Sequence, residues 1–336
     1  MQGNKRLRFA LLAALAAWSL PAVAKDRYYF IGYEVVQVID GDTDQVVASI
    51  PIRGWLRESD FRRDKKSMYV TANRHVVHEV SLGENKVVAS IDVNGDGWER
   101  FIFGFCLAAD EKTAYAAMMS RTTDGGEVVI GKPVVAQINL ETGKILRSVE
   151  VPWGVVQLVP VKGRQAVYAI GKDLYKIDVS GNEMKLTETV PMFEKKQNIL
   201  PLWNFAWEAG GAFVGNYYTP ELMGLLAIDE NSGEITDIPI KGDPVFAYSV
   251  IFSPDRKKVY AVMDDLSVID VASKSYGPVA HIKEGTSYAV NVSSDGKKIY
   301  VGAGGSSVTV YDAETLKRLK VIKMASDGMD LRRVAF

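Results

Sequence analysis

The 336-residue sequence contains only one cysteine, Cys106, and three histidines. A lone cysteine cannot form a disulfide within the chain, and no CxxCH segment is present to attach a c-type haem. Cys106 lies in the apolar run FIFGFCLAAD, where a thiol is typically a small buried hydrophobic group. His75 and His78 lie three apart in a strand-like run, which directs them to opposite faces of a strand. We therefore expect no metal site.

An excess of charge of either sign is also lacking, because the formal net charge is −1. Proteins that bind nucleic acid need a clustered basic surface, so we expect no nucleic-acid partner. The sequence has no GxSxG, GxGxxG, Walker or HExxH motif. We accordingly predict no catalytic residue and no cofactor-binding residue in this chain.

The N-terminal segment 1–24 has the pattern of a secretory signal peptide. A basic start containing Lys5, Arg6 and Arg8 precedes an apolar run, which is followed by Ala22-Val23-Ala24 as a cleavage site. A membrane anchor is the weaker interpretation, because the run is shorter than the roughly 20 residues that span a bilayer. We predict cleavage before Lys25, no membrane span, and a mature chain 25–336 in the periplasm.

An internal repeat dominates the remainder of the sequence. SPDRKKVYAV (253–262) and SSDGKKIYVG (293–302) share one pattern, and five further copies follow from aligning the aromatic residue after the turn. The aligned residues are 40 to 53 positions apart; they are Tyr29, Tyr69, Tyr115, Tyr168, Phe213, Tyr260 and Tyr300. Each copy contains three or four short runs rich in Val, Ile and Tyr, bounded by Gly, Asp, Asn and Ser, a composition that favours strands.

This period predicts an all-β fold, a seven-bladed β-propeller of four-stranded antiparallel blades. The first copy lacks an inner strand, since Tyr29 follows closely on the predicted cleavage point. The C-terminal segment GMDLRRVAF (328–336) resembles an inner strand without a following partner. We expect this tail to pair with the N-terminal blade (25–52) and to close the ring, which removes its last open sheet edge.

Acidic residues recur at one turn of the repeat. Their side chains are expected to hydrogen-bond the local backbone, so we interpret them as folding elements rather than as an active site. They are Asp40, Asp178, Asp229, Asp270 and Asp312.

Two departures from the repeat are candidate interaction sites. The segment 118–134, which begins with Met118 and Met119, is a long polar connection between two strands: either a tolerated surface loop or an arm that reaches a partner. The segments before the inner strands carry large side chains, which either wedge between blades or form a partner-binding surface. These side chains are Trp55, Trp98, Trp153, Trp203, Phe246 and Tyr288, with Met329 in the last copy.

The repeat pattern resembles the YVTN-type propellers of exported bacterial proteins. More narrowly, the opening KDRYYFIGYEVVQVIDGDTDQVV, the insertion at 118–134 and the ending DLRRVAF resemble the β subunit of quinohaemoprotein amine dehydrogenase. That resemblance implies a periplasmic heterotrimer that oxidises primary amines to aldehydes. It places c-type haem on a dihaem cytochrome c subunit and cysteine tryptophylquinone on a small subunit, with no cofactor in this chain.

Two alternatives to this non-catalytic subunit remain. One is a stand-alone periplasmic YVTN-type propeller that acts as a binding module. The other is an enzyme with a site in the central channel.

Overall fold

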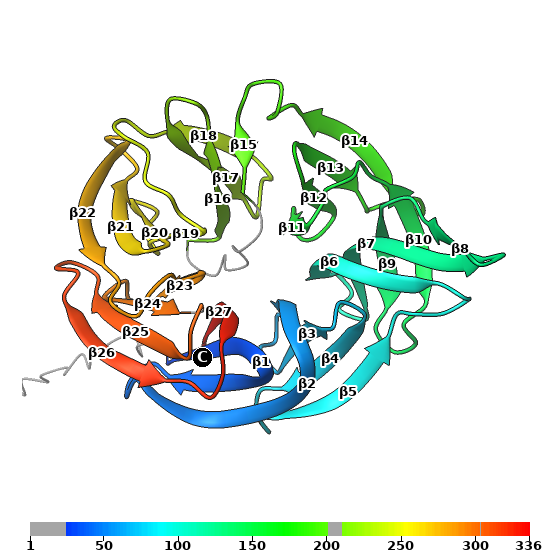
Figure 1. Ribbon diagram of the computed structural model, residues 1–336, viewed down its shortest axis with the longest axis horizontal. Helices are drawn as coiled ribbons and strands as arrows, with labels where there is room; N and C mark the ends of the chain where they lie inside the picture. Colours follow the sequence, from blue (N-terminus) through cyan, green and yellow to red (C-terminus); the bar gives the residue numbers. More distant parts are fainter. Residues whose placement is uncertain (1–24, 201–209, 303) are drawn as a thin grey trace, which may run out of the picture.

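The computed structural model describes residues 25–200, 210–302 and 304–336; Trp203 and the predicted signal peptide 1–24 lie outside these described residues. Within them every regular element is a β-strand, 27 in number, and there is no helix, as the sequence predicts. Consequently no helix of the described chain has the length and hydropathy to cross a membrane. The strands form antiparallel sheets arranged around a central axis, which is a propeller (Figure 1).

The prediction of seven separate four-stranded blades differs from the observed pattern of hydrogen-bonded sheets. Counted by their ladders, the described residues form six blades, of which the first is a six-stranded sheet in the order β27-β1-β2-β3-β4-β5. Its strands are β1 (Asp26–Asp40), β2 (Gln45–Phe61), β3 (Ser67–Ala72), β4 (Val76–Ser81), β5 (Lys86–Asp92) and β27 (Gly328–Ala335). The cause is β2, which pairs with β1 through its first part and with β3 through its second, so two repeats share one strand.

The strand β1 reverses direction within its own length. Its first part pairs with β27 and its second part with β2, and Glu34 between them has a positive φ of 58°. The amide of Gly41 donates a 2.9 Å hydrogen bond to the carbonyl of Asp26. Fifteen fully extended residues would span about 50 Å. The two ends can meet only because the chain folds back near Glu34.

The second sheet has five strands, in which β6, β7, β9 and β10 follow one another outward and β8 pairs only with β7. Its strands are β6 (Glu99–Leu107), β7 (Thr113–Asp124), β8 (Glu127–Ile130), β9 (Val134–Asn139) and β10 (Ile145–Glu150).

Four regular four-stranded sheets complete the ring. They comprise β11 (Gln157–Val161), β12 (Ala166–Ile170), β13 (Leu174–Asp178) and β14 (Lys185–Val190); β15 (Asn198–Ile199), β16 (Ala212–Tyr218), β17 (Met223–Asp229) and β18 (Ile235–Pro239); β19 (Ser249–Phe252), β20 (Lys258–Val262), β21 (Asp265–Asp270) and β22 (Ser275–His281); and β23 (Ala289–Val292), β24 (Lys298–Gly302), β25 (Ser307–Asp312) and β26 (Arg318–Lys323).

The aromatic residue of each repeat is a core residue. All seven, from Tyr29 to Tyr300, are at most 5% exposed. They belong to hydrophobic clusters that fill the spaces between neighbouring sheets, such as the one that joins Tyr260 of β20 to Val292 of β23. One cluster lies inside the six-stranded sheet, where Tyr29 of β1 packs with Val70 of β3. Burial between sheets therefore explains why the repeat keeps an aromatic residue there.

The predicted closure of the ring by the tail is confirmed. The strand β27 pairs antiparallel with β1, from Asp26 opposite Ala335 to Gly32 opposite Gly328. Beyond the ladder, the amide of Lys25 donates to the carbonyl of Phe336 over 3.1 Å, and the reciprocal bond is 3.0 Å. The first and last strands of the described chain thus share one sheet (Figure 1).

The predicted role of the repeated aspartates is also confirmed. Oδ1 of Asp229 accepts hydrogen bonds from the amides of Asn231 (3.0 Å) and Ser232 (2.9 Å). The equivalent carboxylates at Asp40, Asp178, Asp270 and Asp312 accept backbone amides two or three residues later in the same way. These side chains shape turns.

Candidate functional site

The aromatic residues predicted as a partner surface precede the inner strands, and antiparallel topology places them on one face. In a sheet of alternating strands, the link into the first strand and the turn between the second and third strands leave at the same end. Phe246 and Trp153 lie in such links and are 68% and 58% exposed, and Trp55 is also largely exposed. We call this side of the ring the linker face.

The aromatic residues on the linker face also make contacts within the chain. The ring of Phe246 stacks on Tyr218 with centroids 5.5 Å apart, and Tyr288 meets Tyr248 edge-on at 5.2 Å. The guanidinium of Arg57 lies 5.8 Å from the ring centroid of Trp55. The two interpretations are therefore compatible. Phe246 packs against its neighbour through one side of its ring and leaves most of its surface exposed to a partner.

The other predicted site residues differ in burial. Met118 is 4% exposed and belongs to a core cluster with Ile102 and Phe105, and Met119 is half-buried. Trp98 is half-buried and Met329 is buried. Trp203 lies outside the described residues. Whether any of these residues meets a partner stays a prediction.

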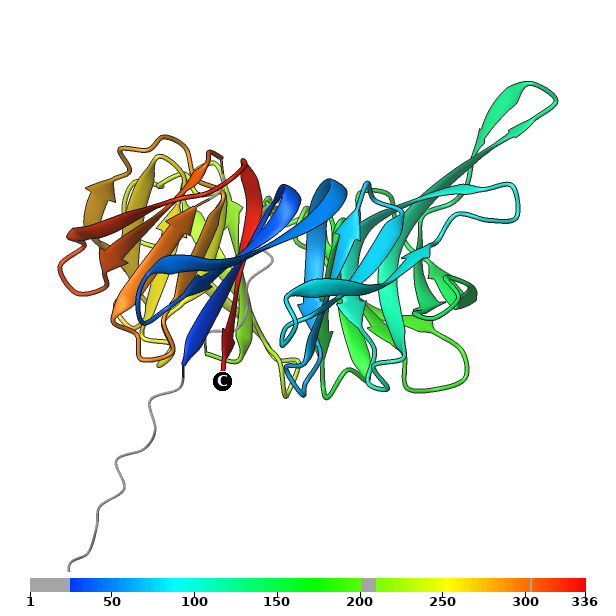
Figure 2. The ribbon, with the colours of Figure 1, turned by 90° about the horizontal axis from the view of Figure 1, so that it is seen from below.

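The segment 118–134 is not the long loop that its polar composition indicated. The strand β7 continues to Asp124 and pairs with β8, so the connection shortens to Gly125 and Gly126, with φ of 56° and 87°. Positive φ at both central residues is the geometry of a tight hairpin turn, which glycine adopts without strain. The result is a two-stranded ribbon, here called the arm (residues 119–131), which projects beyond the ring in the edge view (Figure 2).

The arm has a polar base and an apolar outer strand. At the base, Nε of Arg121 donates to Glu99 over 2.7 Å, and Oγ1 of Thr122 donates to the carbonyl of Gly97 over 2.7 Å. Every residue of β8 is exposed, including Val128, Val129 and Ile130. Because side chains alternate along a strand, these three residues present apolar surface on both faces of the ribbon.

The inner part of β2 carries buried charge where an inner strand is expected to be apolar. Glu58 is buried, and its Oε2 accepts a 2.7 Å hydrogen bond from the hydroxyl of Thr71. Burial raises the pKa of the Glu58 carboxyl, and the guanidinium of Arg57, 3.6 Å from the other oxygen, opposes that shift. This pair lies on the strand that leads from Trp55 on the linker face to the opposite face.

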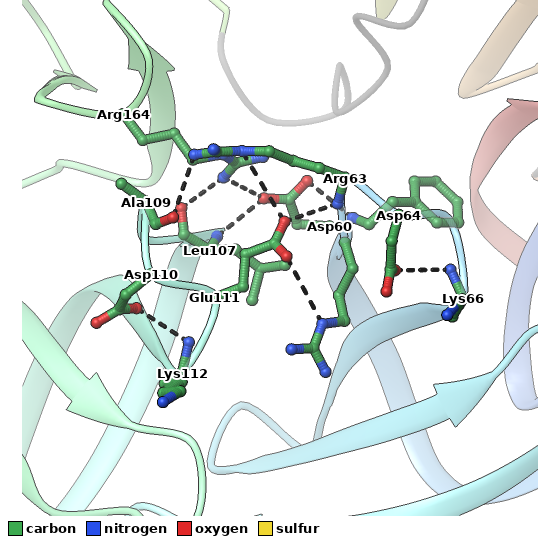
Figure 3. Close-up of polar contacts among 12 residues, drawn as sticks. Asp60, Arg63, Asp64, Lys66, Leu107, Ala109, Asp110, Glu111, Lys112 and Arg164 are labelled. Atoms are coloured by element: carbon green, nitrogen blue, oxygen red, sulfur yellow. Dashed lines mark hydrogen bonds and ion pairs between the residues drawn. The ribbon is translucent and has the colours of Figure 1, made fainter.

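A polar cluster closes the opposite end of β2 (Figure 3). The buried carboxylate of Asp60 accepts the amide of Leu107 over 2.8 Å and Nη1 of Arg164 over 2.7 Å. The same Nη1 donates to the carbonyl of Leu107. Burial lowers the pKa of Arg164, but the Asp60 carboxylate more than offsets this effect and holds the pKa above its ordinary value. One ion pair therefore joins three sheets.

Arg62 and Arg63 extend this cluster at the surface. The amide of Arg63 donates to Oε1 of Glu111 over 2.6 Å, and its Nη2 donates to the carbonyl of Ala109 over 3.3 Å. Nε of Arg62 lies 3.7 Å from Oε2 of Glu111. In Figure 3, the side chains of Arg63 and Arg164 approach from opposite sides, and their guanidinium groups overlap in the view.

The sequence prediction missed this cluster. From the segment RGWLRESDFRR (53–63) it selected only Trp55 as a candidate, although the segment runs from one face to the other. The sequence did contain a signal for the cluster, namely several charged residues in a segment expected to be an inner strand. In the structure four consecutive residues there, Arg57 to Asp60, are polar and buried.

Cys106 and the histidines have ordinary structural environments. Cys106 is buried in a core cluster, and burial raises the pKa of its thiol. Nδ1 of His75 lies 3.2 Å from Asp92, and Nδ1 of His78 lies 2.7 Å from Ser90. In the part of the chain that the structure describes, no three His, Cys, Asp or Glu side chains are grouped to hold a metal ion.

Comparison with known proteins identifies the fold and nothing finer. No family model and no curated protein matches the chain. Among solved structures, apo AztD from Citrobacter koseri is 14% identical with a TM-score of 0.58, over 93% of this chain and 98% of that one. A functionally unknown protein from Desulfotomaculum acetoxidans is 12% identical with a TM-score of 0.63, over 92% and 98%.

Two further structural neighbours are enzymes by name, a synthase and a dehydrogenase. Hydrazine synthase from Kuenenia stuttgartiensis is 16% identical with a TM-score of 0.57, over 88% of this chain and 90% of that one. The dihydro-heme d1 dehydrogenase NirN, in complex with DHE, is 13% identical with a TM-score of 0.57, over 92% and 75%. At such identities the likeness concerns the propeller fold alone.

Proposed function

We propose that this chain is the non-catalytic propeller subunit of a periplasmic quinohaemoprotein amine dehydrogenase, whose quinone and haem reside on partner subunits. The sequence resemblance supplies the identity of the complex. The occurrence of propeller chains in hydrazine synthase and in NirN supports a role within a redox complex. The role of this chain would be to hold a dihaem cytochrome c subunit and a small quinone-bearing subunit in place.

The arm is the single observation that carries the assembly role. A two-stranded ribbon gains little stability of its own in water, and an exposed apolar edge strand promotes unwanted pairing. The arm nevertheless places Val128, 64% exposed, beside two further apolar residues on a projecting strand. It lies on the linker face, close to Trp98, whose Cζ3 is 3.2 Å from where a Cβ on Gly131 would lie. A partner seated on that face would cover the arm and the exposed aromatic residues together.

The proposal includes a ring of seven blades, in which β2 joins the first two. Within the described residues there are seven hydrophobic clusters, one of which separates β1 from β3 inside the six-stranded sheet. Two strands of one flat sheet cannot pack face to face. The cluster between β1 and β3 therefore supports a sheet that bends sharply along β2, so that its two halves act as separate blades. An experimental structure with one planar six-stranded sheet would contradict the sevenfold count.

Co-purification tests the assembly. The tagged chain is isolated from the periplasm of its native host, and bound partners are measured by the haem Soret absorbance and by quinone staining. The arm variant V128K/I130K is expected to lose at least 90% of both signals while its melting temperature stays unchanged. The matched control V279K/L319K changes two equally exposed apolar residues on the outer strands β22 and β26, and should assemble normally.

Each other outcome has a definite meaning. If the unmodified chain carries neither haem nor quinone, the amine dehydrogenase assignment is wrong, and the chain is a stand-alone binding module. If the arm variant retains both signals, the arm is not the contact. W153A provides a second check: it should weaken assembly more than it lowers the melting temperature, because the side chain is 58% exposed.

A further inference from the structure

A pocket of about 300 Å³ opens at the mouth of the channel on the face opposite the arm. Its walls come from the end of β2, the turns that follow it and β11, and the last residues of β27. Six cationic side chains line it, against two carboxylates, Asp60 and Glu230. The six are Arg62, Arg63, Lys65, Arg164, Arg332 and Arg333.

Asp60 pairs with Arg164 and lines the pocket, whereas the carboxylates that pair with three further cations do not line it. Glu111 pairs with Arg62 and Arg63, and Asp26 pairs with Arg333 over 3.0 Å. The lining that a ligand meets therefore carries more positive than negative charge, which attracts an anion.

The guanidinium of Arg164 is fixed in place and keeps N–H donors that its own hydrogen bonds do not use. Its Nη1 donates to Asp60 and to the carbonyl of Leu107, and its side chain is 11% exposed. Nε and Nη2 have no hydrogen-bond partner among the described residues. Nη1 of Arg63 likewise has none, and the 55% exposure of that side chain leaves it accessible. Guanidinium forks of this kind match the oxygens of carboxylate and phosphate groups.

Two guanidinium groups are anchored to the same turn. Arg63 and Arg164 donate to the carbonyls of Ala109 and Leu107, which are two residues apart. Two cations held on one turn repel each other, and an anion bound to both would relieve that repulsion. The size of the pocket suits a compound of a few carbon atoms rather than a macromolecular chain.

We propose that this channel mouth binds a small oxyanion of at least two negative charges, with Arg63 and Arg164 as its principal ligands. Carboxylate and phosphate compounds share the required chemistry. The site lies on the opposite face from the arm, so the inference does not rest on the assembly role proposed above.

Calorimetric titration of the mature chain alone tests the site, with citrate and inorganic phosphate as probes and sodium chloride at matched ionic strength as reference. We expect one molecule of citrate or phosphate to bind per chain, and chloride to give no saturable signal. Binding of citrate alone identifies a carboxylate site, and binding of phosphate alone identifies a phosphate site.

Variants separate a specific site from general attraction. R63A removes an exposed side chain and should weaken binding at least tenfold without lowering the melting temperature. R164K keeps the charge but loses the fork, and should also weaken binding. The matched control R318A removes another exposed arginine paired with a glutamate, Glu284, and should bind as the unmodified chain does. Absence of saturable binding, or equal affinity of R63A and the unmodified chain, would overturn the proposal.

Discussion

Deletion of the last eight residues, Met329 to Phe336, is expected to unfold the ring. These residues form almost all of β27, which supplies the inner strand beside β1. Without them the Asp26–Gly32 part of β1 becomes an open edge, and the last sheet, β23–β26, loses Leu331 from the cluster through which it packs against β1 and β27. The backbone ladder that closes the ring would then be lost, and the N-terminal and C-terminal sheets would be linked mainly by side-chain hydrogen bonds, such as those from Lys298 and Tyr300 to Asp44.

The magnitude follows from the side chains that the deletion removes. Met329, Leu331 and Val334 are all buried, and Leu331 packs with Phe30 and Tyr300 between two sheets. Burial of each such side chain stabilises a fold by about 1.5–3 kcal/mol, so their loss costs about 5–9 kcal/mol. This is comparable to the whole free energy of unfolding of a typical protein, about 5–15 kcal/mol.

Thermal melting followed by far-UV circular dichroism measures the effect, together with the rate of thermolysin digestion. We expect the truncated chain to melt at least about 10 °C lower, or to lack a cooperative transition. L331A should fall between the two chains, at a cost of about 2–5 kcal/mol. L319A, at an exposed site on β26, should change stability by less than about 0.5 kcal/mol. A truncated chain that melts within about two degrees of the full chain would refute the closure of the ring by β27.

Three smaller predictions concern a carboxylate, a thiol and a glycine. Backbone hydrogen bonding from Ser232, then the guanidinium of Arg256, lower the pKa of Asp229 to about 2. The stabilisation from ionised Asp229 is therefore complete above its ordinary pKa of 3.8 and is lost as the pH falls toward 2. Over that range the urea midpoint of D229N should fall less steeply than that of the unmodified chain. Because burial raises the pKa of Cys106, its thiol should not react with DTNB at mildly alkaline pH until the chain is denatured; modification of the native protein would contradict its burial. G54A should cost about 1–3 kcal/mol, because Gly54 has a φ of 111°. G83A, at a position with open space, should melt as the unmodified chain does, and equal melting of both variants would show that β2 is not bent at residue 54.

The elements that the sequence predicts are those set by local pattern. The repeated aromatic residues are buried, and the repeated aspartates shape turns, because each depends on contacts that recur in every copy. The spare C-terminal run pairs with β1 because an incomplete first repeat leaves an edge to fill. The long connection predicted at 118–134 is wrong for a local reason. Asp124-Gly125-Gly126 within alternating residues is a hairpin signal, and the polar composition of the segment hid it; whether the segment is an arm that reaches a partner stays a prediction.

The features that the sequence does not predict depend on contacts between distant repeats. Asp60 and Arg164 are 104 positions apart, and neither lies in a position that the repeat pattern marks. Their ion pair forms because the inner strands of different sheets converge on the central axis. A repeat pattern along the sequence does not show which residues meet there. The continuity of β2 also depends on distant contacts. The segment SIPIRGWLRES has no glycine other than Gly54 to mark a turn, and its pairing is decided by β1 and β3 together.

The topology places the two proposed sites on opposite faces and therefore makes them separable. Links into the inner strands and the arm leave on one face, whereas the turns after the inner strands, with Arg63 and Arg164, leave on the other (Figure 2). The inner part of β2 connects the faces, from Trp55 to Asp60, and Glu58 lies between them as a buried carboxyl with a raised pKa. Buried hydrogen bonds fix the side chains of both Glu58 and Asp60 between the two faces. Coupling between distant sites needs an element with two arrangements, and a strand fixed in this way favours one. R63A should therefore assemble with partners as the unmodified chain does.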